Sequence, residues 1–147
     1  MTKLEDQIRN STQKTMRGKP LPDDGVAQLA SFLRSLKPPP SLASLRDRVD
    51  EDAVNRGQKL FHNHGCVICH APPTYTSPQS YDVDLPEDEE NARFNPPSLR
   101  GLSQRDAYFH NNSARTLKDV LQQHLPQTSG TLSPEERADL IDFLRSL

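Results

Sequence analysis

The chain has 147 residues, of which only 33% are hydrophobic, with no Trp and 13 Pro. Its apolar side chains alone therefore make a thin core for a chain of this length. The formal net charge is -2, with acidic and basic residues spread along the chain, which argues against a nucleic-acid or membrane-surface partner. No hydrophobic stretch approaches the length of a membrane span.

Residues 1–36 repeat a pattern that returns at the end of the chain. The segment 29–36, LASFLRSL, nearly matches the segment 140–147, LIDFLRSL, and each follows a similar helix start. Because the match includes charged and polar positions that packing would not dictate, we interpret 1–36 as the helical back half of a module whose complete copy ends the chain. The alternative is that two amphipathic terminal helices converged on similar sequences.

A Pro-rich segment separates the two copies. Residues 37–48 begin Lys-Pro-Pro-Pro-Ser, which is typical of a stiff, extended linker. We therefore predict a domain boundary there and a second domain at 49–147. That domain begins with a helix that Asp52 can cap, running from Ala53 to about His62. One face of this helix carries Val54, Gly57, Leu60 and Phe61.

The helix leads directly into Cys66-Val67-Ile68-Cys69-His70, and Cys-x-x-Cys-His is the spacing that attaches a c-type haem. Cys66 and Cys69 can each form a thioether to one vinyl group, and His70 then lies under the iron as proximal ligand. These are the only two cysteines, so a zinc site lacks a second Cys pair. A thioredoxin-like pair would need a strand pattern that is missing here. His62 and His64 keep a histidine-assisted metal site open, although we expect both to face solvent.

The sequence thus predicts one covalently bound haem c inside an all-α, cytochrome c-like domain with long Pro-rich loops. A buried porphyrin would add apolar surface that the side chains do not supply. Residues 71–114 are rich in Pro, Asn, Asp and Ser, and we expect them to form a long loop over the haem edge.

Two helices are predicted after this loop. The first places His124 on its apolar face, at i+7 from Leu117, and Pro126 ends it. The last begins at Ser133, with Pro134 at its first position, which is a strong helix start. Its apolar side carries Leu140, Ile141, Leu144 and Leu147.

The sixth iron ligand decides between electron transfer and catalysis. His124 is the predicted ligand, because a neutral imidazole on an apolar face needs a partner and suits iron. A core histidine bonded to a carbonyl or a haem propionate, or one turned to solvent, is the alternative. Met16 and His110 are the other candidates, and the aromatic turn around His110 favours a propionate hydrogen bond over ligation.

Three ordered segments, 94–101, 107–114 and 116–120, resemble the C-terminal haem domain of the bacterial di-haem cytochrome c peroxidase and methylamine-utilisation di-haem enzyme family. The likeness covers roughly residues 49–147. In that family the helix after the aromatic-His-x-x-Ser turn carries the distal iron ligand. This ligand is Met in the peroxidases and Tyr in the methylamine enzyme. His124 lies near the corresponding position of this chain. The resemblance implies thioethers at Cys66 and Cys69, His70 as proximal ligand and His124 as distal ligand. It also implies that Arg100 neutralises a propionate, with a solvated surface Arg as the alternative.

Two functions follow from these expectations. A six-coordinate haem with His70 and His124 as ligands passes single electrons and needs no catalytic residue. The chain would then be a module of a larger multi-haem redox protein. Its partner would be a redox partner protein or a preceding haem domain. The alternative is a di-haem peroxidase-type oxidoreductase acting on hydrogen peroxide. Family members carry the catalytic haem in the first domain, and only the second domain is complete here, which favours electron transfer.

Covalent haem attachment usually takes place outside the cytoplasm, so we expect a periplasmic or otherwise exported protein. The segment 1–14 lacks the apolar core of a signal peptide. Either the signal was removed or the chain is a piece of a longer exported protein.

Overall fold

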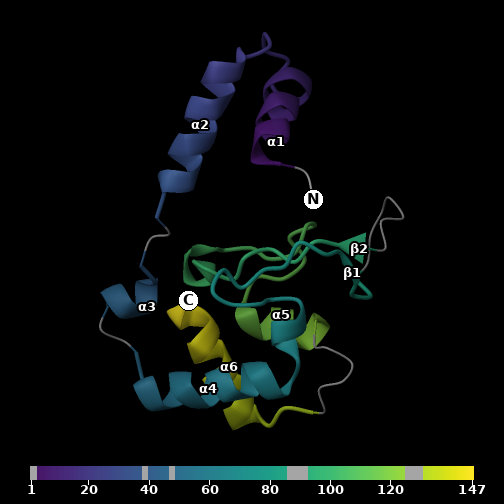
Figure 1. Cartoon of the computed structure of the whole chain (residues 1–147). Coiled ribbons are helices and arrows are strands. Elements are labelled where there is room, and N and C mark those ends of the chain that lie inside the picture. Colours follow the sequence, from purple (N-terminus) through teal and green to yellow (C-terminus); the bar gives the residue numbers. More distant parts are fainter. Residues whose placement is uncertain (1–2, 38–39, 47–48, 86–92, 125–130) are drawn as a thin grey trace. The chain divides into compact units, whose positions relative to one another are not determined.

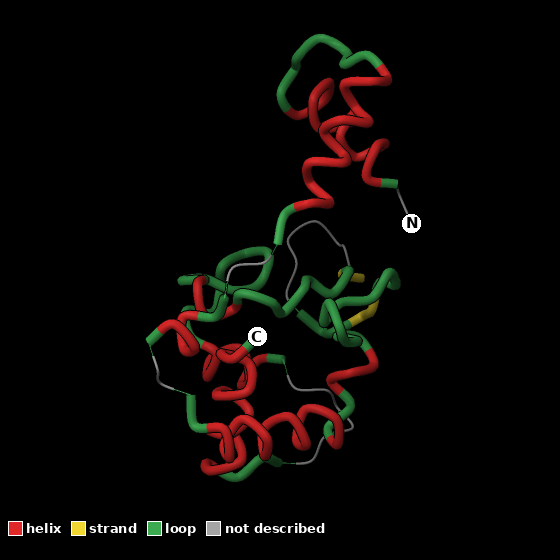
Figure 2. The backbone as a smooth tube through the Cα atoms, turned by 60° about the vertical axis from the view of Figure 1, so that its left-hand side comes forward, coloured by secondary structure: helices red, strands yellow, loops and turns green. Residues whose placement is uncertain are grey.

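The structure is a computed structural model that describes residues 3–37, 40–46, 49–85, 93–124 and 131–147. Two compact units make up the chain, Met1–Pro38 and Pro39–Leu147 (Figures 1 and 2). Among the described residues, no helix has both the length and the apolar character needed to cross a membrane.

The first unit is a pair of helices. Helix α1 (Leu4–Asn10) continues into a π-helical turn, η1 (Ser11–Thr15), and α2 (Asp23–Ser35) follows. A small core of Ile8, Val26 and Ala30 joins the two helices, and an ion pair of 2.8 Å between Arg34 and Glu5 adds to it.

One apolar side of α2 has no cover within this unit. Phe32 and Leu36 are 58% and 56% exposed, and Leu33 is also exposed. In the matching segment of the second unit, Phe143 and Leu144 are buried. The two copies of the repeat therefore differ in what covers the same apolar positions.

The regular structure of the second unit is helical apart from one short ribbon of strands, which confirms the predicted all-α class. Its helices are α3 (Leu42–Leu45), α4 (Glu51–Asn63), η2 (Cys66–Ile68), η3 (Leu102–Gln104), α5 (Leu117–Gln123) and α6 (Pro134–Ser146). The strands β1 (Tyr81–Asp82) and β2 (Arg93–Phe94) form a short antiparallel ribbon in which Tyr81 pairs with Phe94. The remainder of the segment 71–114 is largely irregular, as its composition predicts (Figure 2).

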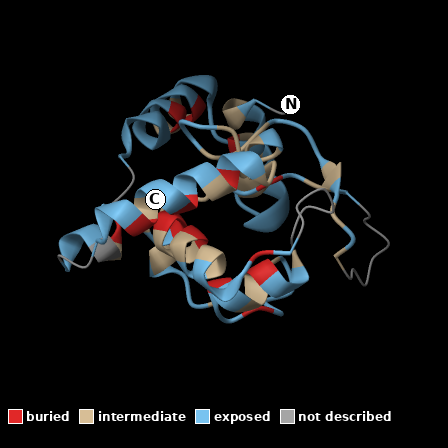
Figure 3. Ribbon diagram, turned by 90° about the horizontal axis from the view of Figure 1, so that it is seen from below, coloured by how far each residue is buried: buried red, intermediate tan, exposed pale blue. Residues whose placement is uncertain are grey.

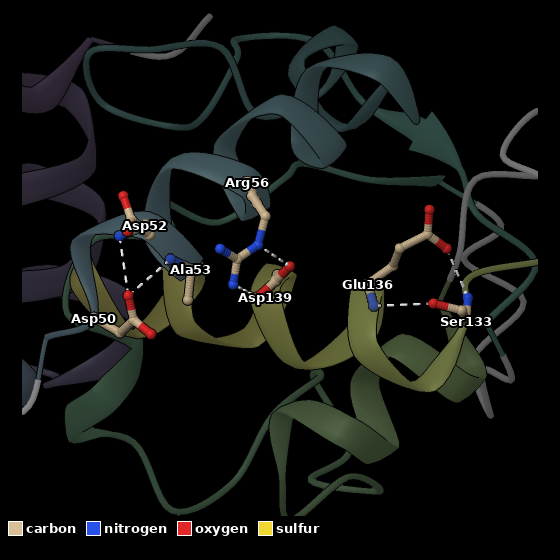
Figure 4. Close-up of polar contacts among 7 residues, drawn as sticks. All are labelled: Asp50, Asp52, Ala53, Arg56, Ser133, Glu136 and Asp139. Atoms are coloured by element: carbon tan, nitrogen blue, oxygen red, sulfur yellow. Dashed lines mark hydrogen bonds and ion pairs between the residues drawn. The ribbon is translucent and has the colours of Figure 1, made fainter.

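The core of this unit lies where α4 and α6 cross. Phe61 of α4 and Phe143 of α6 have ring centroids 5.3 Å apart, and Leu140 and Leu144 complete the contact. Arg56 donates two hydrogen bonds of 2.7 and 2.8 Å to the carboxylate of Asp139 at the edge of the crossing (Figure 4). Figure 3 shows buried residues on one side of these helices and exposed residues on the other, the pattern of amphipathic helices around a core.

The start of α6 is as predicted, whereas the start of α4 is not. Ser133 and Glu136 form a reciprocal capping box, with Pro134 at the first position of α6 (Figure 4). For α4, Asp50 and not Asp52 is the cap, because one Asp50 carboxylate oxygen accepts from the backbone N–H groups of Asp52 and Ala53, each at 3.0 Å. Helix α4 therefore begins two residues earlier than the sequence suggested.

Candidate haem-binding site

The Cys-x-x-Cys-His motif forms a tight turn directly after α4. Gly65 has a φ of 73°, a left-handed conformation that glycine adopts without strain, and it turns the chain into η2. The backbone N–H of His70 donates to the Cys66 carbonyl at 2.9 Å, which closes the turn. Cys66, Cys69 and His70 are half-buried, and Cys66 packs against the core cluster of the unit.

The two thiols are free, and their surroundings do not favour a reactive thiolate. Burial raises the pKa of the Cys66 thiol to about 11 and also raises the pKa of Cys69. Both thiols are therefore protonated at neutral pH, unlike the thiolates of redox-active pairs and zinc sites. In the part of the chain that the structure describes, no group of three or more His, Cys, Asp or Glu is placed to hold a metal ion. The histidine-assisted metal site that the sequence left open gains no support.

His70 is held by a main-chain contact that orients its ring. Its Nδ1 lies 3.1 Å from the carbonyl oxygen of Tyr75. A neutral imidazole donates its Nδ1–H to that carbonyl and keeps the lone pair of Nε2, which is the arrangement of a histidine ligand to a metal. Burial lowers the pKa of His70, while the carbonyls of Tyr75 and Pro97 oppose this shift.

Tyr75 is a site residue that the sequence did not reveal. Its backbone has a φ of 52°. The centroid of its ring lies 5.9 Å from the ring centroid of Phe61 and 6.1 Å from that of Phe143. The aromatic contacts anchor the residue whose carbonyl orients His70. Any residue type supplies a carbonyl, so this role leaves no signal in the sequence.

His124 lies at the end of α5, where the helix has already stopped. The predicted helix includes His124, but α5 ends at Gln123, and His124 has non-helical angles of φ -133° and ψ 75°. Its ring direction is therefore not set by helical spacing alone. Pro126, the predicted helix terminator, lies outside the described residues.

The fold nevertheless brings His124 toward the haem motif. The residue is half-buried, and its ring meets that of Phe109 edge-on, with centroids 6.1 Å apart. Burial lowers the pKa of His124, and the charge of His70 lowers it further.

The remaining candidates are more exposed. His110 is exposed, and its ring stacks on that of Phe94 with centroids 4.7 Å apart. Arg100 is exposed, with its backbone N–H donating to Ser98 Oγ at 3.3 Å. Met16 belongs to the first unit and is 75% exposed.

His62 and His64 differ from each other. His62 is exposed, as expected, whereas the expectation that His64 faces solvent is wrong. His64 is half-buried, and its Nδ1 is shielded without a hydrogen-bond partner among the described residues. The reason is that α4 ends at Asn63, so the chain turns His64 inward as it enters the motif.

These donors suit a covalently bound haem. Cys66 and Cys69 are free thiols at the correct spacing, and the His70 Nδ1 lies beside the Tyr75 carbonyl. Cys66 packs against an apolar core cluster that includes Leu102 and Leu121. The residues present therefore fit a haem c.

A helical unit with this donor set defines a c-type haem domain. Residues 54–147 match the cytochrome c family, and the chain belongs to that family. Membership implies a covalently bound haem c with its iron. The resemblance drawn from the motifs is thereby confirmed for the second unit.

Two known proteins extend the likeness beyond this domain. The chain is 28% identical over 162 residues to the methylamine utilization protein MauG of Methylophilus methylotrophus, an alignment that covers 85% of this chain and 48% of MauG. Its fold is similar to that of Kuenenia stuttgartiensis hydrazine synthase, with a TM-score of 0.71 and 21% identity over 97% of this chain and 61% of the other. The second likeness concerns the fold alone. The chain spans about half the length of MauG.

Proposed function

We propose that the chain is an electron-transfer module with one haem c, attached at Cys66 and Cys69, whose iron is ligated by His70 and His124. Electron transfer through haem follows from membership of the cytochrome c family. When bound, the haem supplies a one-electron change between ferric and ferrous iron. The ligand pair and the single-haem content are the specific parts of the proposal.

The observation that carries the proposal is the half-buried position of His124. Its ring meets that of Phe109, while the ring of His70 is oriented by the Tyr75 carbonyl. A histidine in such a position needs a partner for its ring nitrogens. Two imidazole ligands would leave the iron no open position for a substrate, which supports electron transfer over bond chemistry.

The proposal extends to a larger multi-haem protein. Its support is the exposed apolar side of α2, at Phe32 and Leu33, where the matching Phe143 and Leu144 of α6 are covered. Residues 1–36 would then be the back half of a preceding haem domain, joined through 37–48 to the cytochrome domain at 49–147. That preceding domain or a separate redox protein would exchange electrons with this haem.

Two further assignments depend on the resemblance. Arg100 and His110 are proposed as partners of the haem propionates, and their exposure is compatible with the solvent-facing edge of the ring. An exported, periplasmic location is proposed because covalent attachment at this motif usually takes place outside the cytoplasm. A second function, a di-haem peroxidase-type oxidoreductase acting on hydrogen peroxide, is supported by the likeness to MauG.

Spectra of the full chain, produced with haem-maturation machinery, test the ligand pair. The wild-type protein should be low-spin in both oxidation states, with sharp α and β bands on reduction. His124→Ala should become high-spin, open a position for cyanide and raise peroxidase turnover from a low base. His124→Met should instead raise the reduction potential, because thioether sulfur favours ferrous iron more than imidazole does.

His110→Ala and Met16→Ala serve as matched controls and should keep the low-spin spectrum. A wild-type protein that is already high-spin would favour the peroxidase function. A spectrum that changes in His110→Ala or Met16→Ala but not in His124→Ala would assign the sixth ligand to that other residue.

A further inference from the structure

The second unit contains a cavity of about 540 Å³ that is distinct from the haem site. Its walls come from Leu42 of α3 and Arg46 after it, the start of α4, η3 and the residues after it, the start of α5 and the last turn of α6. Cys66, Cys69, His70 and His124 do not line it. The haem motif therefore does not account for this cavity.

The cavity gathers positive charge from segments far apart in the chain. Among the described residues, its charged lining residues are Arg46, Arg105, Arg115 and Arg145, with Asp50 and Asp142. In this described lining, four guanidinium groups against two carboxylates leave a formal excess of two positive charges. Side chains that repel one another at close range favour an anion between them.

The two carboxylates offset only part of this charge. Asp50 already accepts the two backbone hydrogen bonds that cap α4. Asp142 pairs only loosely with Arg145, at 3.9 Å. Among the described residues, Arg145 is the one lining arginine whose guanidinium nitrogen lies within 4 Å of a carboxylate oxygen. Within the described ranges, the guanidinium groups of Arg105 and Arg115 have no carboxylate at that distance.

Tyr108 lines the cavity together with Arg105 and Arg145, which come from different elements. Its hydroxyl lies 3.1 Å from the Leu102 carbonyl and 3.2 Å from the Arg105 carbonyl, so its hydrogen is already used. Burial raises the pKa of Tyr108, and the charges of Arg145 and Arg105 oppose that rise.

The lining also includes an apolar part. Leu42, Val54 and Leu117 contribute to it together with the Tyr108 ring. Small-molecule sites of roughly 300–1,000 Å³ combine such apolar walls with a few polar groups that orient the ligand. An inorganic anion would leave the apolar part unused.

We propose that this cavity binds a small organic anion that carries two negative charges, as carboxylates or as a phosphate, on an apolar or aromatic body. The planar guanidinium fork forms paired hydrogen bonds with carboxylate and phosphate oxygens. The excess of two positive charges matches a doubly charged ligand. The apolar lining accepts its body.

Isothermal titration calorimetry of the haem-loaded full chain at low ionic strength tests the proposal. The probes are isophthalate, with two carboxylates, phenyl phosphate, which is mostly doubly charged at pH 7.5, and benzoate, with one carboxylate. At least one of the two doubly charged probes should bind saturably, one per chain and at least tenfold more tightly than benzoate. The tighter of the two identifies carboxylate or phosphate as the preferred group.

A matched pair of variants on the same helix makes the test specific. Arg145→Gln removes a lining guanidinium and should weaken binding of the preferred probe about tenfold. Arg137→Gln removes a charge from α6 outside the lining and should leave binding unchanged. The absence of saturable binding by both doubly charged probes, or an equal loss in the two variants, would overturn the proposal.

Discussion

Replacing Gly57 by Ala should destabilise the second unit, because α4 has no room for a side chain where it crosses α6. A Cβ atom at Gly57 would lie 2.0 Å from the carbonyl oxygen of Asp139 and 2.8 Å from the Cβ of Phe143. Ordinary contacts begin at 3.4 Å. The obstacle is backbone, which cannot rotate away as a flexible side chain can, so the helices would have to separate by about 1.4 Å.

The size of the effect follows from two opposing contributions. Overpacking of a core costs about 1–3 kcal/mol and more in severe cases. Ala is favoured over Gly in a helix by about 1 kcal/mol, which offsets part of that cost. Because separation would also loosen the packing of Phe61 against Phe143, we expect a net loss of about 2–3 kcal/mol in the free energy of unfolding. The melting temperature should fall by about 8–12 °C for a unit of this size.

Denaturant and thermal unfolding measure this loss, with tyrosine fluorescence as the probe. All three tyrosines lie in the second unit, so the signal reports on that unit alone. Gly25→Ala in α2 is the control, because its Cβ would meet only the Pro22 ring, at 3.6 Å, and because this glycine lies in the first unit. The unfolding transition that tyrosine fluorescence reports should therefore stay as in the wild type. A Gly57→Ala protein as stable as the wild type would refute the close approach of α4 and α6.

Three further changes test the motif, an ion pair and a helix cap. Haem should become extractable by acid-acetone when Cys66 and Cys69 are both changed to Ser, since no other covalent link to the ring is expected; haem that stays with the protein would contradict the attachment. The hydrogen bonds from Arg56 hold the pKa of Asp139 below its ordinary value. The stabilisation of the fold by this pair is therefore fully present above about pH 3.9, the unfolded-state pKa, and is lost as the pH falls through the lower pKa of the folded state. Asp139→Asn should therefore show a smaller fall in denaturant midpoint on acidification than the wild type, and equal pH profiles would rule this out. Ser133→Ala should lower the free energy of unfolding by about 1 kcal/mol through loss of the capping box, and an unchanged denaturant midpoint would count against it.

Features that depend on neighbouring residues could be predicted from the sequence. The spacing of Cys66, Cys69 and His70 indicates haem attachment because one ring must meet all three within a single turn. The cap of α6 was predicted for the same reason, since Ser133 and Glu136 reach each other across one helical turn. The prediction that Asp52 caps α4 was wrong, because Asp50 is an equally good capping residue and only the backbone angles decide where the helix begins.

Features that depend on distant segments were decided by the tertiary structure. Three features of this kind involve residues that are far apart in the chain or lie outside regular helices. They are the tight crossing at Gly57, the Tyr75 carbonyl beside His70 and the half-buried position of His124 after the end of α5. The cavity of the second unit likewise draws its arginines from four separate segments. Helical periodicity shows which face of a segment is apolar, but not which other segment covers it. That partner is set by the packing of the whole unit, in which each contact is possible only because the others hold the backbone in place.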